Sequence, residues 1–445
     1  MTIKISPMIN AELESRGVAT VILDLDDTLA ATIASGGKSS ATLSKLAAGF
    51  TDSKYSPLGL RAASSGPRKK TLAQGLSAAP GRAPSLNLPP DMKIFRNLGL
   101  AFGVVDAKGL AMLARNESVQ RVLATPAISL IRPTNRAALR PNLSQKLTWG
   151  LESLGVERLW AEGLNGEGVL VAHLDTGVDG KHPALQDATQ DFALFDNFGD
   201  PIRKTAFDDD GHGTHTAGTI AGRPVKGRCI GVAPGAKLLS GKVIEGGEVI
   251  ARVLGGMDWA VGSGARVLSM SLGLRDYVDD FLAVTRKLRE RGVLPVFAIG
   301  NEGVGHTRTP GNYDACLSVG AHDAKYRVAE FSGSQQILNP DGHYRIVPDL
   351  LAPGVGVESA HAGSTGYAAL DGTSMATPHI AGLAALLFQA KKTATVDEVE
   401  QAIFASCKRT NAVSELRAGR GWPNAAKALQ HLTGVTLAAK RRSRK

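Results

Sequence analysis

The sequence predicts an α/β protein with a mostly parallel sheet covered by helices on both faces, preceded by a small α+β region. Short apolar runs alternate with segments of helical periodicity between residues 147 and 434. Such alternation is typical of βαβ units, whose crossover helices cover both faces of a parallel sheet. Strands are expected at residues 168–174, 237–243, 266–272, 293–299 and 315–321, and helices at 212–221, 248–262, 278–291, 374–390, 396–406 and 423–432.

A serine stands at the start of the longest apolar helical run. Ser374 precedes Pro378, which is close enough to the helix start to be tolerated in a first turn. Helix amides and the helix dipole favour negative charge there, which suits a nucleophile whose attack creates an oxyanion. Serine before a helix more often serves as an N-cap, so this pattern alone leaves both interpretations open.

Two further stretches hold the partners that such a serine needs. The apolar run 169–174 ends in Asp175, at the carboxyl end of a predicted parallel strand, where open sheets bind their ligands. His212 lies between two glycines. Together these residues predict an acyl-transfer triad, in which Asp175 orients His212, His212 moves the proton of Ser374, and Ser374 attacks.

These stretches, in this order, resemble the signatures of the subtilisin-like serine peptidases, family S8. The order Asp, His, Ser is the known order of subtilisins, and the absence of Gly-x-Ser-x-Gly disfavours an α/β-hydrolase. The resemblance implies a three-layer subtilisin-like fold and a serine endopeptidase that hydrolyses peptide bonds in proteins through an acyl-enzyme. Six further blocks are similar to blocks of the family, in family order: 179–183, 231–236, 271–273, 300–303, 348–354 and 419–425.

The resemblance also implies roles for residues around the triad. Asn301, after the strand expected at 293–299, would donate to the oxyanion beside the backbone N–H of Ser374. A bound peptide would add as an extended strand, and its primary pocket would accept a small or apolar side chain because no acidic residue stands at the floor. The implied substrate-binding residues are Ser271, Leu272, Gly273, Gly246, Gly247, Ala298 and Gly300, with the loop 307–310 at the pocket.

The N-terminal region resembles the small α+β propeptide of the family, which assists folding and acts as an intramolecular inhibitor. Its patterns predict a helix and a strand in residues 8–26, a strand at 94–105, an amphipathic helix at 107–124 and a strand at 127–131. The expected division is residues 1–132 as propeptide-like region, 133–146 as linker and processing site, 147–434 as peptidase domain and 435–445 as basic tail. Residues 29–91, rich in Gly, Ser and Pro, are expected to be a disordered basic insert.

Charge and cysteine content bear on partners and compartment. The net charge of +10 is concentrated in the insert and the tail, so contact with nucleic acid through either segment is a weak alternative to a solvated linker. Three widely spaced cysteines, Cys229, Cys316 and Cys407, indicate reduced thiols or at most one disulfide. With no N-terminal apolar stretch and no apolar run of about 18 residues, the prediction is a cytoplasmic protein without a membrane span, with secretion as the alternative.

No cofactor is expected, and calcium is the one metal considered. Many subtilisins bind calcium in a loop after the histidine helix, but residues 222–229 carry three cations and no carboxylate or carboxamide, so the usual ligands are absent. His182, His215 and His379 lack the partners of a zinc site and are expected to support the structure. His173 shares a strand face with Asp175 and is expected to be a packed histidine.

Two other functions compete with the peptidase. Asp24-Leu25-Asp26-Asp27-Thr28 resembles the first motif of haloacid-dehalogenase-type phosphatases, but strands often end in acidic turn residues, and the rest of such a domain does not follow. The other is a catalytically silent subtilisin-fold binding scaffold. It is weakened because all four catalytic positions are filled.

Overall fold

The computed structural model describes residues 4–36, 40–51, 92–137, 146–244, 249–339 and 341–437. The chain divides into two compact units by its contacts. The first unit comprises Met1–Ala127 with Asp196–Asp200 and Ile250–Trp259, and the second comprises Ile128–Phe195, Pro201–Val249 and Ala260–Lys445.

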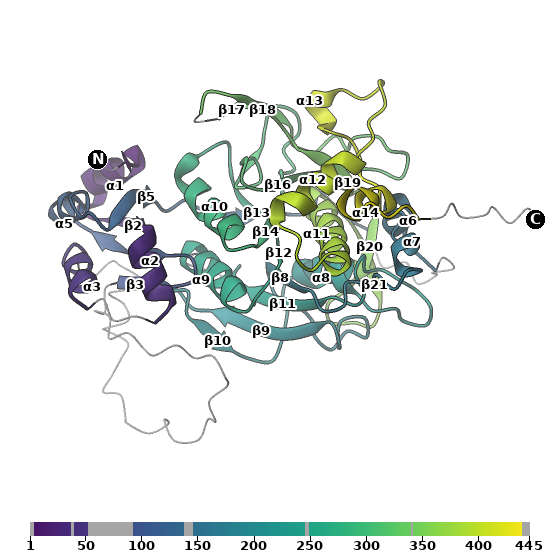
Figure 1. The fold of residues 1–445 in the computed structure, drawn as a ribbon, viewed down its shortest axis with the longest axis horizontal. Helices are drawn as coiled ribbons and strands as arrows, with labels where there is room; N and C mark the ends of the chain where they lie inside the picture. The colour runs from purple at the N-terminus through teal and green to yellow at the C-terminus, as the bar shows by residue number, and fades with distance from the viewer. Residues whose placement is uncertain are drawn as a thin grey trace, which may run out of the picture. The chain divides into compact units, whose positions relative to one another are not determined.

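The first unit is built on a sheet with the strand order β1-β5-β2-β4-β3. The central strand β2 is antiparallel to both β4 and β5 and is buried along almost its whole length. Helix α1 packs beside β2, and its start is capped by the side chain of Ser6. The described elements, purple to blue in Figure 1, are β1 (Lys4–Ile5), α1 (Pro7–Arg16), β2 (Ala19–Leu25), α2 (Asp27–Ala34), α3 (Ser40–Ala47), β3 (Met92–Phe95), β4 (Leu100–Val105), α5 (Ala107–Leu113) and β5 (Val119–Ala124).

The helix predicted at 107–124 is wrong in its second half. Helix α5 ends at Leu113, and Asn116 forms a turn by accepting from the Ser118 N–H at 3.0 Å. The chain then returns as β5, whose Val119 and Val122 are buried against β2. Similarly, the strand expected at 94–105 is two strands, joined by a turn at Gly99 with φ of +67°. In β5, short helical periodicity was outweighed by pairing with the distant strand β2, whereas in the other segment the turn at Gly99 lets the chain fold back so that β3 and β4 pair.

The prediction of disorder from residue 29 onward is also wrong at its start. Residues up to 47 include helices α2 and α3, whose Leu29, Ile33 and Leu46 are buried in the core of the first unit. The remaining insert, residues 52–91, lies outside the described residues. In the acidic motif that resembles a phosphatase, Asp26 caps α2 by accepting from the N–H groups of Thr28 and Leu29 at 2.9 and 3.1 Å.

The second unit is built on an eight-stranded sheet, counted among the described residues, with the order β10-β9-β11-β8-β12-β14-β16-β19. Every neighbouring pair in it is parallel except β10 with β9. Helices α8 and α11 pack on one face and α10 on the other, as the three-layer prediction requires (Figure 1). The predicted strands and helices are present, with boundaries shifted by about two residues at most, except that the helix expected from residue 278 begins as the 3-10 turn η1 and becomes α-helical only at Leu282.

The sheet strands and the helices around them have these bounds: α6 (Trp149–Leu154), α7 (Glu157–Trp160), β8 (Leu170–Asp175), β9 (Thr189–Phe195), β10 (Pro201–Arg203), α8 (His212–Ala221), β11 (Lys237–Lys242), β12 (Val267–Met270), η1 (Asp279–Phe281), α10 (Leu282–Glu290), β14 (Leu294–Ala298), β16 (Leu317–His322), β19 (Leu350–Pro353), α11 (Thr373–Ala390), α12 (Val396–Ser406), α13 (Glu415–Ala418) and α14 (Ala425–Thr433). Most of helix α9 (Val249–Gly262) belongs to the first unit by its contacts. Three small sheets complete the unit: β15 (Arg308–Thr309), β13 (Leu272–Arg275) and β6 (Ser129–Leu130); β20 (Val357–Ala360), β21 (Tyr367–Asp371) and β7 (Asn135–Ala137); and β17 (Gln335–Leu338) with β18 (Tyr344–Val347).

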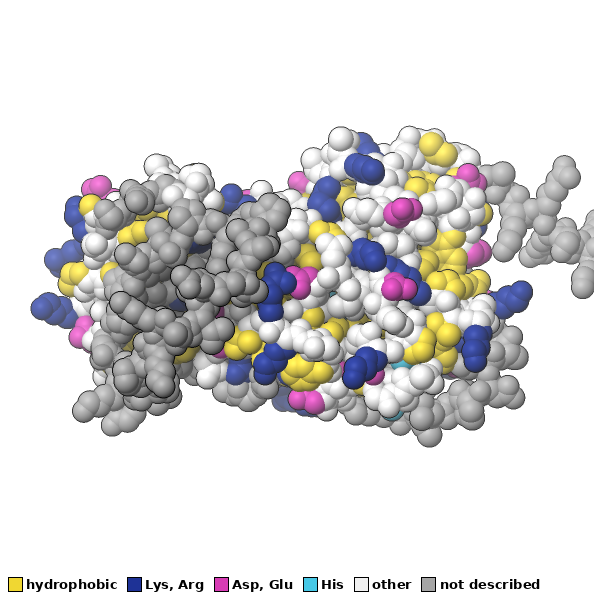
Figure 2. All heavy atoms as spheres, turned by 90° about the horizontal axis from the view of Figure 1, so that it is seen from below, with side chains coloured by type: hydrophobic (Ala, Val, Ile, Leu, Met, Phe, Trp, Pro, Cys, Tyr) yellow, Lys and Arg dark blue, Asp and Glu magenta, His cyan; other side chains and the backbone are white. Residues whose placement is uncertain are grey.

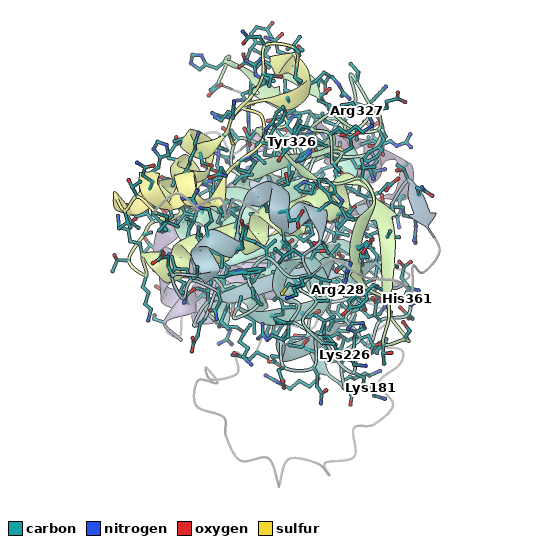
Figure 3. All side chains as sticks on the ribbon, turned by 90° about the vertical axis from the view of Figure 1, so that its right-hand side faces the viewer. Lys181, Lys226, Arg228, Tyr326, Arg327 and His361 are labelled. Atoms are coloured by element: carbon teal, nitrogen blue, oxygen red, sulfur yellow. The ribbon has the colours of Figure 1, made fainter. Side chains whose placement is uncertain are left out.

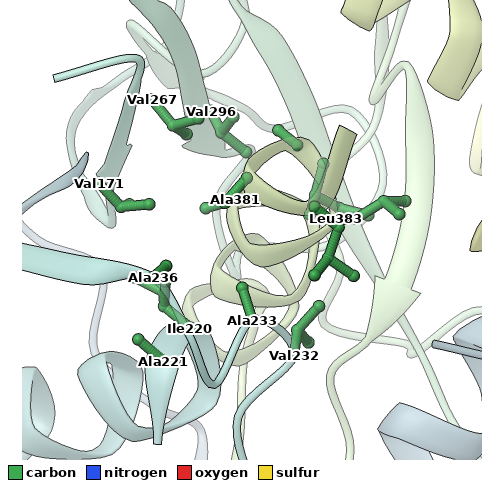
Figure 4. Packing of buried hydrophobic residues seen from close by; sticks show 14 of the residues in the cluster. Val171, Ile220, Ala221, Val232, Ala233, Ala236, Val267, Val296, Ala381 and Leu383 are labelled. Atoms are coloured by element: carbon green, nitrogen blue, oxygen red, sulfur yellow. The ribbon is translucent and has the colours of Figure 1, made fainter. Parts of the chain in front are cut away.

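Helix α11 runs through the core of the second unit. It is buried from Thr373 to Phe388, which is why its sequence is apolar on every side. Figure 4 shows Ala381 and Leu383 of α11 among Val171 of β8, Ile220 of α8 and Val232. A helix start held this firmly is a rigid support for the side chains at its N-terminus. Within the described residues, no helix is both long and apolar enough to cross a membrane.

Candidate active site

Asp175 ends β8, between its neighbours β11 and β12. Only 1% of the residue is exposed, and Oδ1 accepts from the Thr176 N–H at 2.7 Å. Two residues later Gly177 has φ of +124°, and a Cβ there would lie 2.2 Å from the carbonyl oxygen of Phe207. Glycine is therefore required for the chain to turn away directly after the carboxylate.

His212 is the first residue of α8, and its two neighbouring glycines have steric roles. Gly211 has φ of +90°, and a Cβ on Gly213 would lie 2.1 Å from the carbonyl oxygen of Gly177. This close approach brings His212 Nδ1 to 2.6 Å from Asp175 Oδ1. Burial alone would raise the pKa of Asp175, but the charge of His212 and the hydrogen bond from it hold that pKa below its usual value.

Ser374 is the second residue of α11 and is fully buried. Because the helix begins at Thr373, Pro378 lies in the second turn, and the expectation of a first-turn proline was wrong. Proline has no N–H to donate to the carbonyl oxygen of Ser374. The hydroxyl of Ser271 donates to that oxygen instead, at 3.5 Å, and so links the turn between β12 and β13 to the serine.

Asn301 lies on the loop after β14, and its amide is held in one orientation. Its Oδ1 accepts from both the N–H and the hydroxyl of Thr373, each at 2.9 Å. Its Nδ2 donates to the carbonyl oxygen of Arg132 at 2.9 Å. The residue next to Ser374 therefore fixes the amide so that its N–H groups point away from Thr373.

Residues 128–137, which we call the crossing segment, run past these side chains. Strand β6 is antiparallel to β13, with Ser129 opposite Gly273 and Leu130 opposite Leu272. Next, the N–H of Ile131 donates to the carbonyl oxygen of Ser271 at 3.0 Å, and the Ser374 hydroxyl donates to the carbonyl oxygen of Ile131 at 2.5 Å. The segment continues as β7, antiparallel to β21. It is bound on both sides of Ser374 as an added strand.

The structure brings Asp175 and His212 into a hydrogen bond, but it does not join His212 to Ser374 in the same way. The Ser374 hydroxyl is turned to Ile131. His212 Nε2 is buried and has no hydrogen-bond partner within the described part of the chain. The crossing segment thus holds the proton that a histidine base would take.

The wall beside β13 contains a charged pair that sequence patterns did not indicate. Arg308 Nη2 lies 2.5 Å from Glu302 Oε1, and Arg308 Nη1 donates to the Ser129 hydroxyl at 3.0 Å. Its aliphatic stem covers both expected pocket glycines, since a Cβ on Gly273 or Gly300 would come within 3.0 Å of it. Arg308 lies within the loop 307–310 expected at the pocket and Glu302 within the block 300–303, but nothing in the sequence indicated that the two residues pair.

The other predicted binding residues differ in how far the structure describes them. Ala298 ends β14 and is buried, and Leu272 lies on the strand that pairs with the crossing segment. Gly246 and Gly247 lie outside the described residues, as does most of the linker expected at 133–146, apart from residues 133–137 and Lys146.

A model of the Subtilase family, Peptidase_S8, matches residues 166–422. The chain belongs to this family. It is 38% identical over 275 residues to "Alkaline protease" of Alkalihalobacillus alcalophilus, which covers 61% of this chain and 67% of that protein. "Subtilisin Savinase" of Lederbergia lenta is 39% identical over 248 residues, 55% of this chain and 86% of that protein. "Major intracellular serine protease" of Bacillus subtilis (strain 168) is 34% identical over 250 residues, 54% and 75% of the two chains.

Membership makes this subtilase a subtilisin-like serine endopeptidase, as the sequence predicted. The matched residues all lie after the crossing segment.

The loop after the histidine helix of this subtilase does not fit a calcium ion. Arg223 of this loop donates to the nearby backbone carbonyls of Ala221, Pro234 and Asp187. Arg228, labelled with Lys226 in Figure 3, pairs with Glu358. Carbonyl oxygens that could bind a cation are thus bound to a guanidinium, and no step of the chemistry is assigned to a metal.

Proposed function

We propose that this chain hydrolyses peptide bonds in proteins through an acyl-enzyme on Ser374. The observation that supports it best is the crossing segment, which binds as an added strand and brings the carbonyl groups of Ile131 and Arg132 to the Ser374 hydroxyl and the Asn301 amide. These are the two groups that nucleophilic attack and oxyanion stabilisation require.

The reaction begins when a substrate carbonyl carbon lies next to Ser374 Oγ. His212 Nε2 takes the hydroxyl proton while Oγ forms a bond to the carbon, and the carbonyl π electrons move to its oxygen. Asp175, hydrogen-bonded to Nδ1–H, holds the ring in the tautomer whose Nε2 is free and stabilises the imidazolium. The oxyanion accepts hydrogen bonds from the Asn301 amide and from the Ser374 backbone N–H.

The tetrahedral intermediate then collapses. The C–N bond breaks, and His212 gives its proton to the leaving amine. Water enters, loses a proton to His212 and attacks the ester carbonyl, so that a carboxylic acid leaves and Ser374 regains its proton. Each step uses groups that α8, α11 and the loop after β14 support.

Casein turnover by four full-length proteins tests this function: the wild type, Ser374→Ala, His212→Ala and the control Ser364→Ala. Ser364 lies in a surface loop and its hydroxyl contacts His361. We expect loss of turnover in the two site variants alone. Undiminished activity of Ser374→Ala would overturn the proposal.

We also propose that the crossing segment is the inhibitory part of the N-terminal region. It takes up the β13 edge that a substrate needs and binds the Ser374 hydroxyl. If the enzyme processes itself, the nearest bonds are those that follow Ile131 and Arg132. We expect Ile131→Pro, which lacks the N–H donated to Ser271, to react faster with a fluorophosphonate probe, while Ile131→Val keeps the wild-type rate. Equal rates for all three would reject the inhibitory role.

The rival of a silent binding scaffold has one observation in its favour, the absent hydrogen bond between His212 and Ser374. A wild type that binds casein but neither hydrolyses it nor takes up the probe would favour that rival. Contact with nucleic acid also stays a prediction, because the basic tail and most of the insert lie outside the described residues. On the face in Figure 2, Lys and Arg side chains lie scattered among other types.

Localisation stays a prediction too. The relatives' names include alkaline proteases and a major intracellular serine protease, so they do not support the cytoplasmic expectation over the secreted alternative. We carry the secreted alternative forward, and fractionation of the producing cells tests it, since protein confined to the lysate would reject it.

A further inference from the structure

A second histidine lies directly behind the pair of Asp175 and His212. His173 is on β8, two residues before Asp175, so both side chains face α8 from the same side of the sheet. The residue is 1% exposed, and His173 Nε2 lies 3.7 Å from Asp175 Oδ2, too far for a hydrogen bond. Thr216, one helical turn after His212 on α8, lies close to both groups.

The contacts form a chain that ends at the carboxylate. Ser240 of β11 is opposite His173 in the sheet, and its Oγ lies 3.2 Å from His173 Nδ1. His173 Nε2 lies 2.8 Å from Thr216 Oγ1, and the Thr216 hydroxyl lies 3.2 Å from Asp175 Oδ2. Asp175 Oδ1 already accepts from His212 and Thr176, so Thr216 serves the other carboxylate oxygen.

The direction of the protons follows from the chemistry of the members. Burial lowers the pKa of His173, and the nearby His212 lowers it further, against the opposing effects of Asp175 and Asp208, so the ring is neutral at neutral pH. A neutral imidazole donates from one nitrogen and accepts at the other. If Nε2–H donates to Thr216 Oγ1, the threonine proton is free to go to the strongest acceptor nearby, the carboxylate.

Competing acceptors show why the histidine matters. The carbonyl oxygens of His212 and Gly213 lie 3.3 and 3.1 Å from Thr216 Oγ1, so the threonine alone has three places for its single proton. A donor that occupies one lone pair of Oγ1 restricts the rotation of the hydroxyl. The other ring nitrogen of His173, Nδ1, accepts from the Ser240 hydroxyl.

We propose that His173 is a positioning residue that acts through Thr216 to hold the second carboxylate oxygen of Asp175, and with it the orientation of His212. The inference rests on the proposed function. His173 is not a second base, because both of its ring nitrogens are already engaged, Nδ1 with Ser240 and Nε2 with Thr216. The role is to limit rotation of the carboxylate, which matters to turnover and not to substrate affinity.

Kinetics of full-length variants test the inference, with active enzyme counted by fluorophosphonate labelling. We expect Thr216→Val to lower kcat by about tenfold or more, the factor for one hydrogen bond to a charged group, with KM within about twofold of the wild type. His173→Val should also lower kcat, and His173→Gln, which can still donate to Thr216 and accept from Ser240, should restore it. Thr219→Val is the matched control, because Thr219 is equally buried on α8 but bonds only to the His215 carbonyl.

A double variant separates this role from a merely structural one. If His173 acts through Thr216, adding His173→Val to Thr216→Val lowers kcat no further, whereas independent packing effects multiply. The same variants in a Ser374→Ala chain need no activity: the NMR signal of the His212 Nδ1–H proton should shift in Thr216→Val and stay in Thr219→Val. Wild-type kcat and an unshifted signal in Thr216→Val would overturn the inference, while activity in Ser374→Ala alone would instead overturn the proposed function.

Discussion

Acid should unfold this protein well before its carboxylates are protonated, because several buried histidines are held neutral. Burial lowers the pKa of His215 to about 3 and the pKa values of His322 and His379 to about 4. The Nε2 of His215 bonds to the carbonyl oxygens of Val357 and Ala368, while its Nδ1 has no partner within the described residues. A proton added there would be buried without an acceptor.

The sign and the size of this loss of stability follow from proton linkage. Above pH about 6.5 neither the folded nor the unfolded state protonates these rings, so stability is full. As the pH falls toward the folded pKa values near 4, the unfolded chain gains protons that the folded chain does not. Below pH 6.5, each of these rings then lowers the free energy of unfolding by roughly 1.4 kcal/mol per pH unit. At pH 5 the loss is roughly 2 kcal/mol for one ring and roughly 6 kcal/mol for these three. Typical net stability is about 5–15 kcal/mol.

Urea unfolding of the Ser374→Ala chain at several pH values between 8 and 5 measures this loss without self-digestion. His379→Leu should reduce the loss between pH 8 and pH 5 by roughly 2 kcal/mol, whatever its effect at pH 8, because one of the buried neutral rings is removed. His431→Leu is the control, since His431 is exposed. A free energy of unfolding that stays constant from pH 6.5 to 5 would refute the reasoning.

Three further predictions concern the site and its surroundings. Asn301→Leu should lower kcat by about 10²–10³-fold with little change in KM, a magnitude established on subtilisin itself; a loss below about tenfold would deny Asn301 its role. EDTA should leave the Tm unchanged because the Arg223 guanidinium already bonds the carbonyl oxygens near this loop; a fall of more than about 4 °C, roughly 1 kcal/mol or more, would reveal a bound metal. Gly177→Ala should destabilise the protein by more than about 3 kcal/mol in urea unfolding, because its Cβ would clash with a carbonyl oxygen. Gly163→Ala, with φ of +77° and open space around it, should cost only about 1–2 kcal/mol, and equal costs would contradict the steric argument.

Patterns of short range predicted most of the second unit. The strands of the parallel sheet and the helices that cover it can be recognised from local sequence because each one is a buried apolar segment. Helix α11 is an example, since it is buried along almost its full length. The pairing of Asp175 with His212 also followed from sequence, since a carboxylate at a strand end and a histidine between glycines are local signals. Their roles in catalysis remain predictions.

Pairing across long distances could not be predicted from these patterns. β5 looked helical because its alternation is broken, and its pairing with the distant strands β1 and β2 decides its state. A strand was expected at residues 127–131, but nothing in the sequence of these residues indicates that β13 is the strand with which they pair. The orientation of Asn301 depends on Thr373, and the role inferred for His173 depends on Thr216 and Ser240, so both require the folded chain.

Intact mass of the full-length wild type beside Ser374→Ala, followed over time with the fluorophosphonate probe, tests the central claim most directly. The account predicts that the wild type gains one probe, mapped to Ser374, and that any self-cleavage falls at the crossing segment, while the variant keeps its mass. A wild type that never takes up the probe, even as Ile131→Pro, or a probe found on another residue, would contradict the claim that Ser374 is the nucleophile.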